Sequence, residues 1–262
     1  YNGIVCGEQN SISSGIESSS ILGGSLNSIT GGTRNSIISG AASSITATGG
    51  SNVVGGSNNI ISGTSAVSTA LGLQSTISNA DRATTMGSSA IAYRNNQVSM
   101  GGGQFAARGD AQASNIRLMK AVSGTIEDTL TIGGVNYNAG TTGRAILDIS
   151  VGSTNARIWN AKIQVVAVVQ TVGSGGTLTL GSSLIGNYAV GIKRILANTS
   201  LVGTVQNLHT LQADTGMETS VITIDADDTN EALRIRFTPP TAAVAGTVIR
   251  VVATVYLTEV GY

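Results

Sequence analysis

A unit of about eight residues repeats through the first hundred residues of the chain, and so short a repeat restricts the fold to a solenoid or an intertwined fibre. Each unit places a β-branched residue three positions before a glycine. Clear examples are NSISSG (10–15), SSILGG (19–24), NSITGG (27–32), NSIISG (35–40) and NNIISG (58–63). β-branched side chains favour strands and glycine favours tight turns, so each unit predicts one strand followed by one turn.

Two such units predict one coil of a flat β-roll, with coils stacked at the strand spacing of about 4.8 Å. The residues predicted to keep the register, one per unit, are Ile12, Ile21, Ile29, Ile37, Ile45, Val53 and Ile60. Many units carry a second apolar residue beside the first, as in Ile21-Leu22 and Ile37-Ile38. Because neighbouring residues of a strand point to opposite faces, we expect one to fill the roll and the other to enter a core between chains.

A single roll of this kind would be thin. Each unit offers only one or two apolar side chains, which is too little to offset the entropy lost in ordering about eight residues. Fibres solve this problem by associating several chains around an axis, so we expect a homotrimer. A flexible Gly/Ser/Asn linker is the alternative, and it is disfavoured because linkers do not maintain an apolar register over many units.

Longer strands with alternating apolar and polar residues replace the repeat after Gly109. In residues 156–171, Trp159, Ala161 and Ile163 share one face with further apolar residues, which predicts a half-buried antiparallel strand and places Trp159 in the core. Further strands are predicted at 177–180, 220–225, 232–237 and 248–260.

Together these patterns predict an all-β chain in three parts. Residues 1–100 form the octad-repeat β-solenoid shaft, residues 101–114 a junction, and residues 115–262 an antiparallel β-sandwich of jelly-roll type. The last part is long enough to bury most of its surface and to fold as one unit.

Charge and composition narrow the possible partners. The formal net charge is zero, which gives no electrostatic case for binding nucleic acid or inserting at an anionic membrane. No apolar run approaches the roughly eighteen residues of a membrane span. Cys6 is the only cysteine and is expected to be a small apolar filler; with His209 as the only histidine, no zinc cluster and no cofactor are expected. Since the chain opens inside a repeat, we expect it to be the carboxy-terminal piece of a longer fibre.

The segment MGGGQFAARGDAQAS (100–114) resembles the junction in many tailed-phage fibre and virion proteins, where a glycine-rich repeat shaft ends in a GDAQ-type sequence before a terminal β-sandwich. The stretches ALRIRF (232–237) and AGTVIRVVATVYLTEVG (245–261) are similar to the closing strands of those domains, although residues 249–253 lack the tryptophan often present there. The repeats also resemble the head repeats of trimeric autotransporter adhesins, which form left-handed β-roll trimers.

This resemblance implies the trimeric tip of a tail fibre, located on the virion and extracellular. Its implied partners are upstream virion tail proteins and a bacterial cell-surface receptor, commonly a glycan. A protein could also serve as that receptor.

Tyr137 and Tyr188 are the candidate receptor-binding residues. They stand in GGVNYNAGTTG and GSSLIGNYAVG, which are Asn- and Gly-rich and predict loops, and loops at the ends of a sandwich are where recognition usually takes place. His209 has no acid and nucleophile near it in the sequence and is expected to be a structural or surface residue.

Two further motifs have simpler explanations. Arg108-Gly109-Asp110 spells an integrin-type tripeptide, but three-residue matches are common by chance and integrin binding is not expected. Asp225, Asp227 and Asp228 offer oxygen ligands of the kind that calcium prefers, yet they lack the glycine and closing glutamate of an EF-hand, so a solvated turn is favoured.

A glycan-degrading tailspike would be the enzymatic counterpart of an attachment fibre. Glycosidases need two carboxyl groups either about 5 Å or about 6.5–9.5 Å apart. The acids of the repeats, Glu8, Glu17 and Asp81, are widely separated, and many of the later acids gather around Asp227. We therefore assign no catalytic residue and expect no enzymatic activity. The repeats are also compatible with a bacterial trimeric adhesin and with a purely structural neck or head fibre of the virion.

Overall fold

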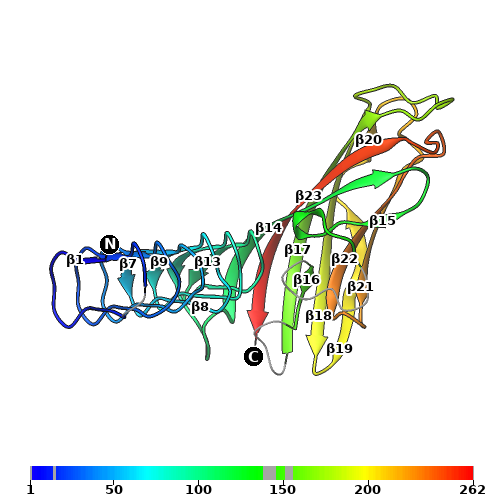
Figure 1. Cartoon of the computed structure of the whole chain (residues 1–262). Helices are drawn as coiled ribbons and strands as arrows, with labels where there is room; N and C mark the ends of the chain where they lie inside the picture. Colours follow the sequence, from blue (N-terminus) through cyan, green and yellow to red (C-terminus); the bar gives the residue numbers. More distant parts are fainter. Residues whose placement is uncertain (1, 14–15, 138–145, 151–155, 262) are drawn as a thin grey trace. The chain divides into compact units, whose positions relative to one another are not determined.

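The computed structural model describes residues 2–13, 16–137, 146–150 and 156–261 (Figure 1). They form strands and loops with one short 3₁₀ helix, η1 (Ile132–Gly134), and no α-helix. The all-β prediction is confirmed. No helix in this part of the chain could cross a lipid bilayer. The chain divides into two compact units: a shaft unit, Tyr1–Ser114 with Thr258–Tyr262, and a terminal unit, Asn115–Leu257.

The shaft unit is a β-solenoid made of two parallel sheets. The first sheet contains β1 (Gly3–Ile4), β3 (Ser20–Ile21), β5 (Ser36–Ile37), β7 (Asn52–Ser57), β9 (Thr69–Leu73), β11 (Thr84–Ser88) and β13 (Val98–Gly102). The second contains β2 (Ser11–Ile12), β4 (Ser28–Ile29), β6 (Ser44–Ile45), β8 (Ile60–Ser62), β10 (Thr76–Ser78) and β12 (Ile91–Ala92). Ser20 pairs with Ser36 and Ile29 with Ile45, so two units make one coil, as predicted.

The register residues fill the interior of the roll. Ile21, Ile29, Ile37 and Ile45 are fully buried. The prediction for Ile60 is wrong: Ile60 pairs with Ser44 and is exposed, whereas Ile61 pairs with Ile45 and is buried. The unit NNIISG has isoleucine in the place that serine occupies elsewhere, so the first isoleucine points outward.

Buried Asn and Ser side chains join successive coils along the inside of the roll. The Asn27 Oδ1 accepts a hydrogen bond from the backbone N–H of Ser43 at 3.1 Å, and the Asn27 N–H donates to the Oδ1 of Asn10 at 3.0 Å. Asn35 accepts from the N–H of Ser51 in the same way. The polar residue before each strand therefore satisfies a backbone donor that the narrow interior would otherwise leave unpaired.

The turns need more than the predicted glycines. Gly24 has a φ of 88°, and a Cβ there would overlap the carbonyl oxygen of Gly40 in the next coil, so glycine is required. A few residues on, most units also contain a non-glycine residue with positive φ, as at Leu26 and Arg34. These residues occupy the same place in successive coils. Their residue types do not predict the left-handed backbone conformation that they adopt.

The outward faces of the two solenoid sheets differ in polarity. On the first sheet, most coils expose one residue of the apolar ladder, defined as Val5, Leu22, Ile38, Val54, Leu71 and Met100; Met86, between Leu71 and Met100, is half-buried. On the second sheet the corresponding places hold Thr30, Thr46, Ser62 and Ser78. The first sheet thus presents a row of apolar side chains, and the second a row of hydroxyl groups with Ile60 as an exposed apolar neighbour.

The terminal unit contains two antiparallel sheets that share one hydrophobic core. The large sheet has the order β14 (Ala111–Ser123), β23 (Val248–Gly261), β17 (Ala156–Thr171), β18 (Ser183–Ile195) and β19 (Asn198–Asn207), with β20 (Gln212–Ala213) also pairing with β18. The small sheet contains β15 (Asp128–Thr129), β22 (Ala232–Thr238), β16 (Leu147–Asp148) and β21 (Val221–Asp227). The jelly-roll arrangement stays a prediction.

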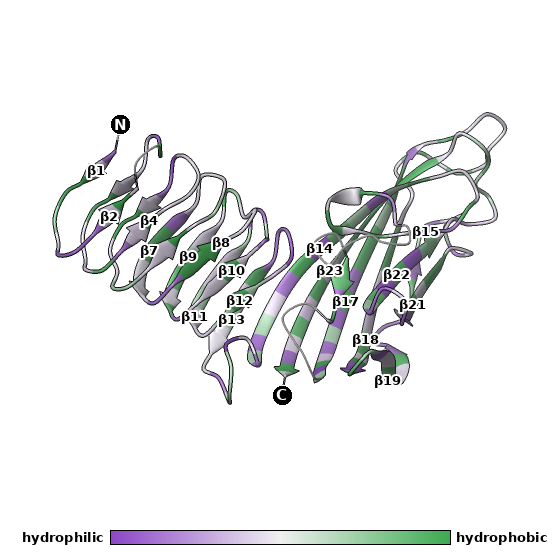
Figure 2. Cartoon of the chain, turned by 60° about the horizontal axis from the view of Figure 1, so that its bottom comes forward, coloured by the Kyte–Doolittle hydropathy of each residue, from purple (hydrophilic) through white to green (hydrophobic). Residues whose placement is uncertain are grey.

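Alternating hydropathy builds this core, and it is visible along β14, β17 and β23 in Figure 2. Trp159 is fully buried in the core with Phe237, as predicted for Trp159. The strand expected at 177–180 is absent: these residues form a loop in which Leu178 packs into the core and Leu180 is exposed. β18 and β19 were not predicted, because Gly186, Asn187 and Gly203 interrupt their apolar alternation.

Candidate recognition surface

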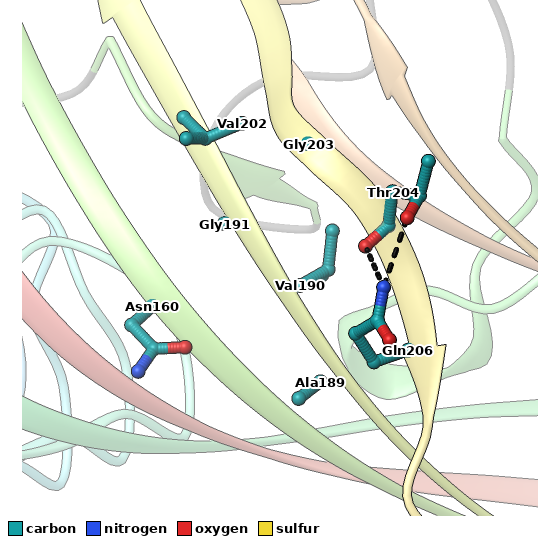
Figure 3. A pocket seen from close by; sticks show the side chains of 8 residues that line it. All are labelled: Asn160, Ala189, Val190, Gly191, Val202, Gly203, Thr204 and Gln206. Carbon is teal, nitrogen blue, oxygen red and sulfur yellow. Dashed lines mark hydrogen bonds between the residues drawn. The ribbon is translucent and has the colours of Figure 1, made fainter.

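A groove of about 420 Å³ lies on the outward face of the large sheet, across β17, β18 and β19 (Figure 3). This volume falls in the range of small-ligand sites, which is about 300–1,000 Å³. The groove is lined by Asn160, Ala189, Val190, Gly191, Val202, Gly203, Thr204 and Gln206.

A β-bulge and small side chains create the groove. Ala189 pairs with Gln206 and Gly191 with Val202, so residues 203–205 of β19 stand opposite the single residue Val190 of β18. Gly203 adopts a φ of 76°, which helps β19 to bend away. A Cβ on Gly191 would lie only 3.0 Å from the Cβ of Val202, so any larger residue would crowd the floor.

The groove offers uncharged hydrogen-bonding groups. Gln206 donates from Nε2 to the carbonyl oxygen of Thr204 at 3.2 Å and to its hydroxyl at 2.9 Å (Figure 3). Asn160 projects from β17 on the other side of the groove. Residues 203–205 face the single residue Val190, so the bulge leaves surplus residues without a strand partner in β18. Amides and a hydroxyl suit the hydroxyl groups of a sugar, but none of the lining residues is an acid or a base for catalysis.

Tyr137 lies outside the strands, as predicted, but its hydroxyl group is already bonded. It donates to the carboxylate of Asp227, and Asn230 donates from Nδ2 to the Tyr137 oxygen at 3.2 Å and to Asp227 at 3.0 Å. Burial raises the pKa of Tyr137, and the Asp227 charge raises it further. For Asp227, burial opposes ionisation, yet the hydrogen bonds from Tyr137 and Asn230 hold its pKa below the usual value. Only the half-buried ring of Tyr137 therefore remains for a ligand.

The solvated turn predicted for the aspartates around 225–228 is confirmed only in part: Asp225 and Asp227 lie in β21, whereas Asp228 is exposed in the turn that follows. Asp225 receives two hydrogen bonds from Arg234, at 2.9 and 3.0 Å, and one from Arg236 at 2.7 Å. The Asp228 carboxylate accepts the backbone N–H of Thr199 at 2.6 Å. The alternation of β21 and β22 places the arginines beside the acids, which the linear sequence does not reveal. No group of three or more potential metal ligands occurs among the described residues.

The loop context predicted for Tyr188 is wrong. Tyr188 lies in strand β18 and is only 8% exposed, packed in the core of the terminal unit, and burial raises its pKa. Its ring takes the space above Gly186, where a Cβ would lie 2.7 Å from the ring. The Gly- and Asn-rich sequence around it is part of a strand that packs closely, so Tyr188 does not join the groove.

Arg108-Gly109-Asp110 serves the structure of its own loop. Asp110 is 6% exposed, and its carboxylate accepts the backbone N–H groups of Phe105, Ala106 and Ala107 at 2.9, 2.6 and 2.7 Å. Burial opposes ionisation of Asp110, but these hydrogen bonds lower its pKa. Arg108 donates to the hydroxyl of Thr76 at 3.1 Å. The aspartate that a receptor would need is therefore occupied.

The remaining single residues of interest are both on the surface. His209 is exposed in the loop after β19, in line with the prediction. Cys6 is exposed, so its expected role as an apolar filler is wrong. It lies in the turn after β1, and its Sγ is 3.0 Å from the carbonyl oxygen of Leu22.

Comparisons with known proteins do not assign the chain to a family. No protein-family model matches the sequence, and no curated protein matches it. Among solved structures, the chain has a likeness to the crystal structure of the Acinetobacter baumannii phage AM24 tailspike protein, with 10% sequence identity and a TM-score of 0.27. The alignment covers 100% of this chain and 57% of that chain. At this TM-score the likeness carries no argument about fold or function.

Proposed function

We propose that the chain forms the tip of a virion tail fibre of a tailed bacteriophage and attaches the particle, as a homotrimer, to a glycan on the bacterial surface. The junction sequence at 100–114 and the division into a shaft unit and a terminal unit support this proposal. In this proposal the terminal unit binds the receptor, and the shaft unit is a spacer between the terminal unit and the rest of the virion.

The observation that carries the proposal is the apolar ladder. Leu22, Ile38 and Leu71 are 41–45% exposed in their coils, while the second sheet presents hydroxyl groups. A row of apolar side chains at the strand spacing of about 4.8 Å fits best against another row with the same spacing, and a second copy of this chain offers one. Burying the ladder between copies would turn a thin solenoid into a fibre with a shared core.

An attachment role fits the chemistry better than glycan cleavage. A glycosidase requires a general acid whose pKa is raised. Asp110, Asp214 and Asp227 do not suit this role, because hydrogen bonds to their carboxylates lower the pKa of all three. The groove offers amides and a hydroxyl, which bind sugars without cleaving them.

The proposal is tested by adding the fluorescently labelled full chain to candidate bacterial hosts. We expect it to label cells and to block adsorption of the virus. Bare cells across the hosts on which the virus grows would indicate a purely structural fibre. Release of reducing sugar ends from purified surface polysaccharide would indicate a tailspike enzyme instead.

A further inference from the structure

The large sheet of the terminal unit is free of acidic residues. None of its five main strands, β14, β17, β18, β19 and β23, contains Asp or Glu between residues 115 and 257. The acids of the terminal unit lie instead in the small sheet and in loops, where many of them pair with arginine or lysine. This separation gives the sheet one face whose charges all have the same sign.

The basic residues of these strands divide by the side to which they point. Lys120 and Arg194 pair with Asp128 and Glu231, at 3.3 and 3.0 Å, and Arg157 is 2% exposed. The outward-pointing bases are Arg117, Lys162, Lys193 and Arg250. Within the described part of the chain, none of these four forms an ion pair.

Two of these lysines, Lys162 and Lys193, lie beside residues that line the groove, although neither lines it. Asn160 pairs with Gly191 across β17 and β18, Lys162 pairs with Ala189 on one side, and Lys193 pairs with Ile158 on the other. Lys162 and Lys193 are therefore separated by two steps of two residues, roughly 14 Å along the strands. Asn160 lies between the two lysines along the strands, and Gln206 lies in the same cross-strand row as Lys162, so a chain of sugars bound at the groove would pass near both ammonium groups and amides.

We infer that this face binds an anionic glycan, with Lys162 and Lys193 contacting carboxylate or phosphate groups while Asn160 and Gln206 bind neighbouring hydroxyls. This inference rests on the proposed function and names the chemical class of its ligand. Charge complementarity selects this occupant, because an acid-free basic face attracts a polyanion. Packing the face against the same face of a second copy would bring lysines together without compensating acids, which disfavours a contact between copies here.

The test measures binding of short oligosaccharides to the full chain by calorimetry, at about 50 and 300 mM salt. The probes are oligogalacturonate, which carries carboxylates, a dextran oligomer bearing phosphate groups, and neutral dextran of the same length. We expect the anionic probes to bind more tightly than neutral dextran and to weaken with salt. A preference between them identifies the anion as carboxylate or phosphate.

The matched variants are Lys162→Gln and Lys193→Gln, with Arg34→Gln as the control. Each lysine variant should weaken anionic binding about two- to fivefold, as expected for partly exposed charge pairs. Arg34 is an exposed shaft residue at a positive-φ position that Gln9 occupies in another coil, so its replacement removes one charge without straining the turn.

Several outcomes would overturn the inference. They are equal binding of neutral dextran, anionic binding that the lysine variants leave intact, and a change in particle mass on Lys162→Glu, which would place the face between copies. Cell labelling by the full chain without binding of any anionic probe would leave the proposed attachment role intact and remove only the ligand class. Absence of cell labelling would count against the attachment role itself.

Discussion

Asn27 illustrates how a single side chain holds the solenoid together. It is fully buried, accepts the N–H of Ser43, and donates from Nδ2 to the carbonyl oxygens of Gly23 and Gly40 at 3.2 and 3.0 Å. Replacing it with alanine leaves these groups without a partner in a narrow interior. We expect Asn27→Ala to lower the free energy of unfolding by about 1–3 kcal/mol, measured by denaturant titration.

Two comparison variants make this prediction specific. Asn27→Ser should cost less than Asn27→Ala, because Ser43 holds the same place in the next coil. Asn207→Ala, at an exposed residue at the end of β19, should leave stability unchanged. Equal stability of all three variants would show that the buried Asn and Ser side chains joining successive coils do not stabilise the shaft.

Ionisation of Asp110 should make the stability of the folded chain depend on pH. Its pKa in the folded chain lies below the unfolded value of 3.8, so its contribution to stability is fully present above that value and is lost as the pH falls through the lower, folded pKa. Asp110→Asn should therefore destabilise the chain at about pH 7, and the difference from the parent should shrink by about pH 2. A difference that stays constant over this range would contradict the assignment. Urea unfolding at the two pH values measures it.

At the scale of elements, the two solenoid sheets make a matched experiment possible. Ile38 and Thr46 both point outward, one from the first sheet after β5 and the other from the second after β6. Ile38→Asp should abolish association because it places a charge in the apolar ladder, whereas Thr46→Asp should be tolerated. Light scattering should return about three times the 26.3 kDa chain mass for the parent and for Thr46→Asp, and 26.3 kDa for Ile38→Asp. A parent that is monomeric would remove the basis for the fibre.

The elements differ in how far the sequence alone predicts them. The shaft was predictable because Ile21, Ile37 and their equivalents recur at a fixed spacing, and side-chain periodicity is a local property. The strand at 156–171 was predictable for the same reason. β18 and β19 were not, because their glycines and asparagines resemble turn residues until their neighbours in the sheet are known.

Across the whole molecule, the candidate site lay beyond the sequence because it depends on register. The groove forms because residues 203–205 bulge opposite Val190. A single sequence does not reveal such a mismatch in the number of paired residues between two strands. Likewise, Tyr137 and Asp227 meet across 90 positions of the chain. Tyr137 was found from its loop context, whereas Asn160 and Gln206 carried no motif that could have singled them out.

Association of three chains through the shaft should strengthen attachment to a cell surface. A shallow groove of amides with lysines beside it should bind a short oligosaccharide weakly, and three linked copies should bind a dense surface at least about a hundredfold more tightly. Ile38→Asp should therefore keep the parent affinity for an oligosaccharide in solution but lose most cell labelling, and fusing it to an unrelated trimeric coiled coil should restore the labelling. If the monomeric variant labelled cells as strongly as the parent, attachment would not depend on the fibre. If it also lost oligosaccharide binding, the shaft would be part of the binding site and not a spacer.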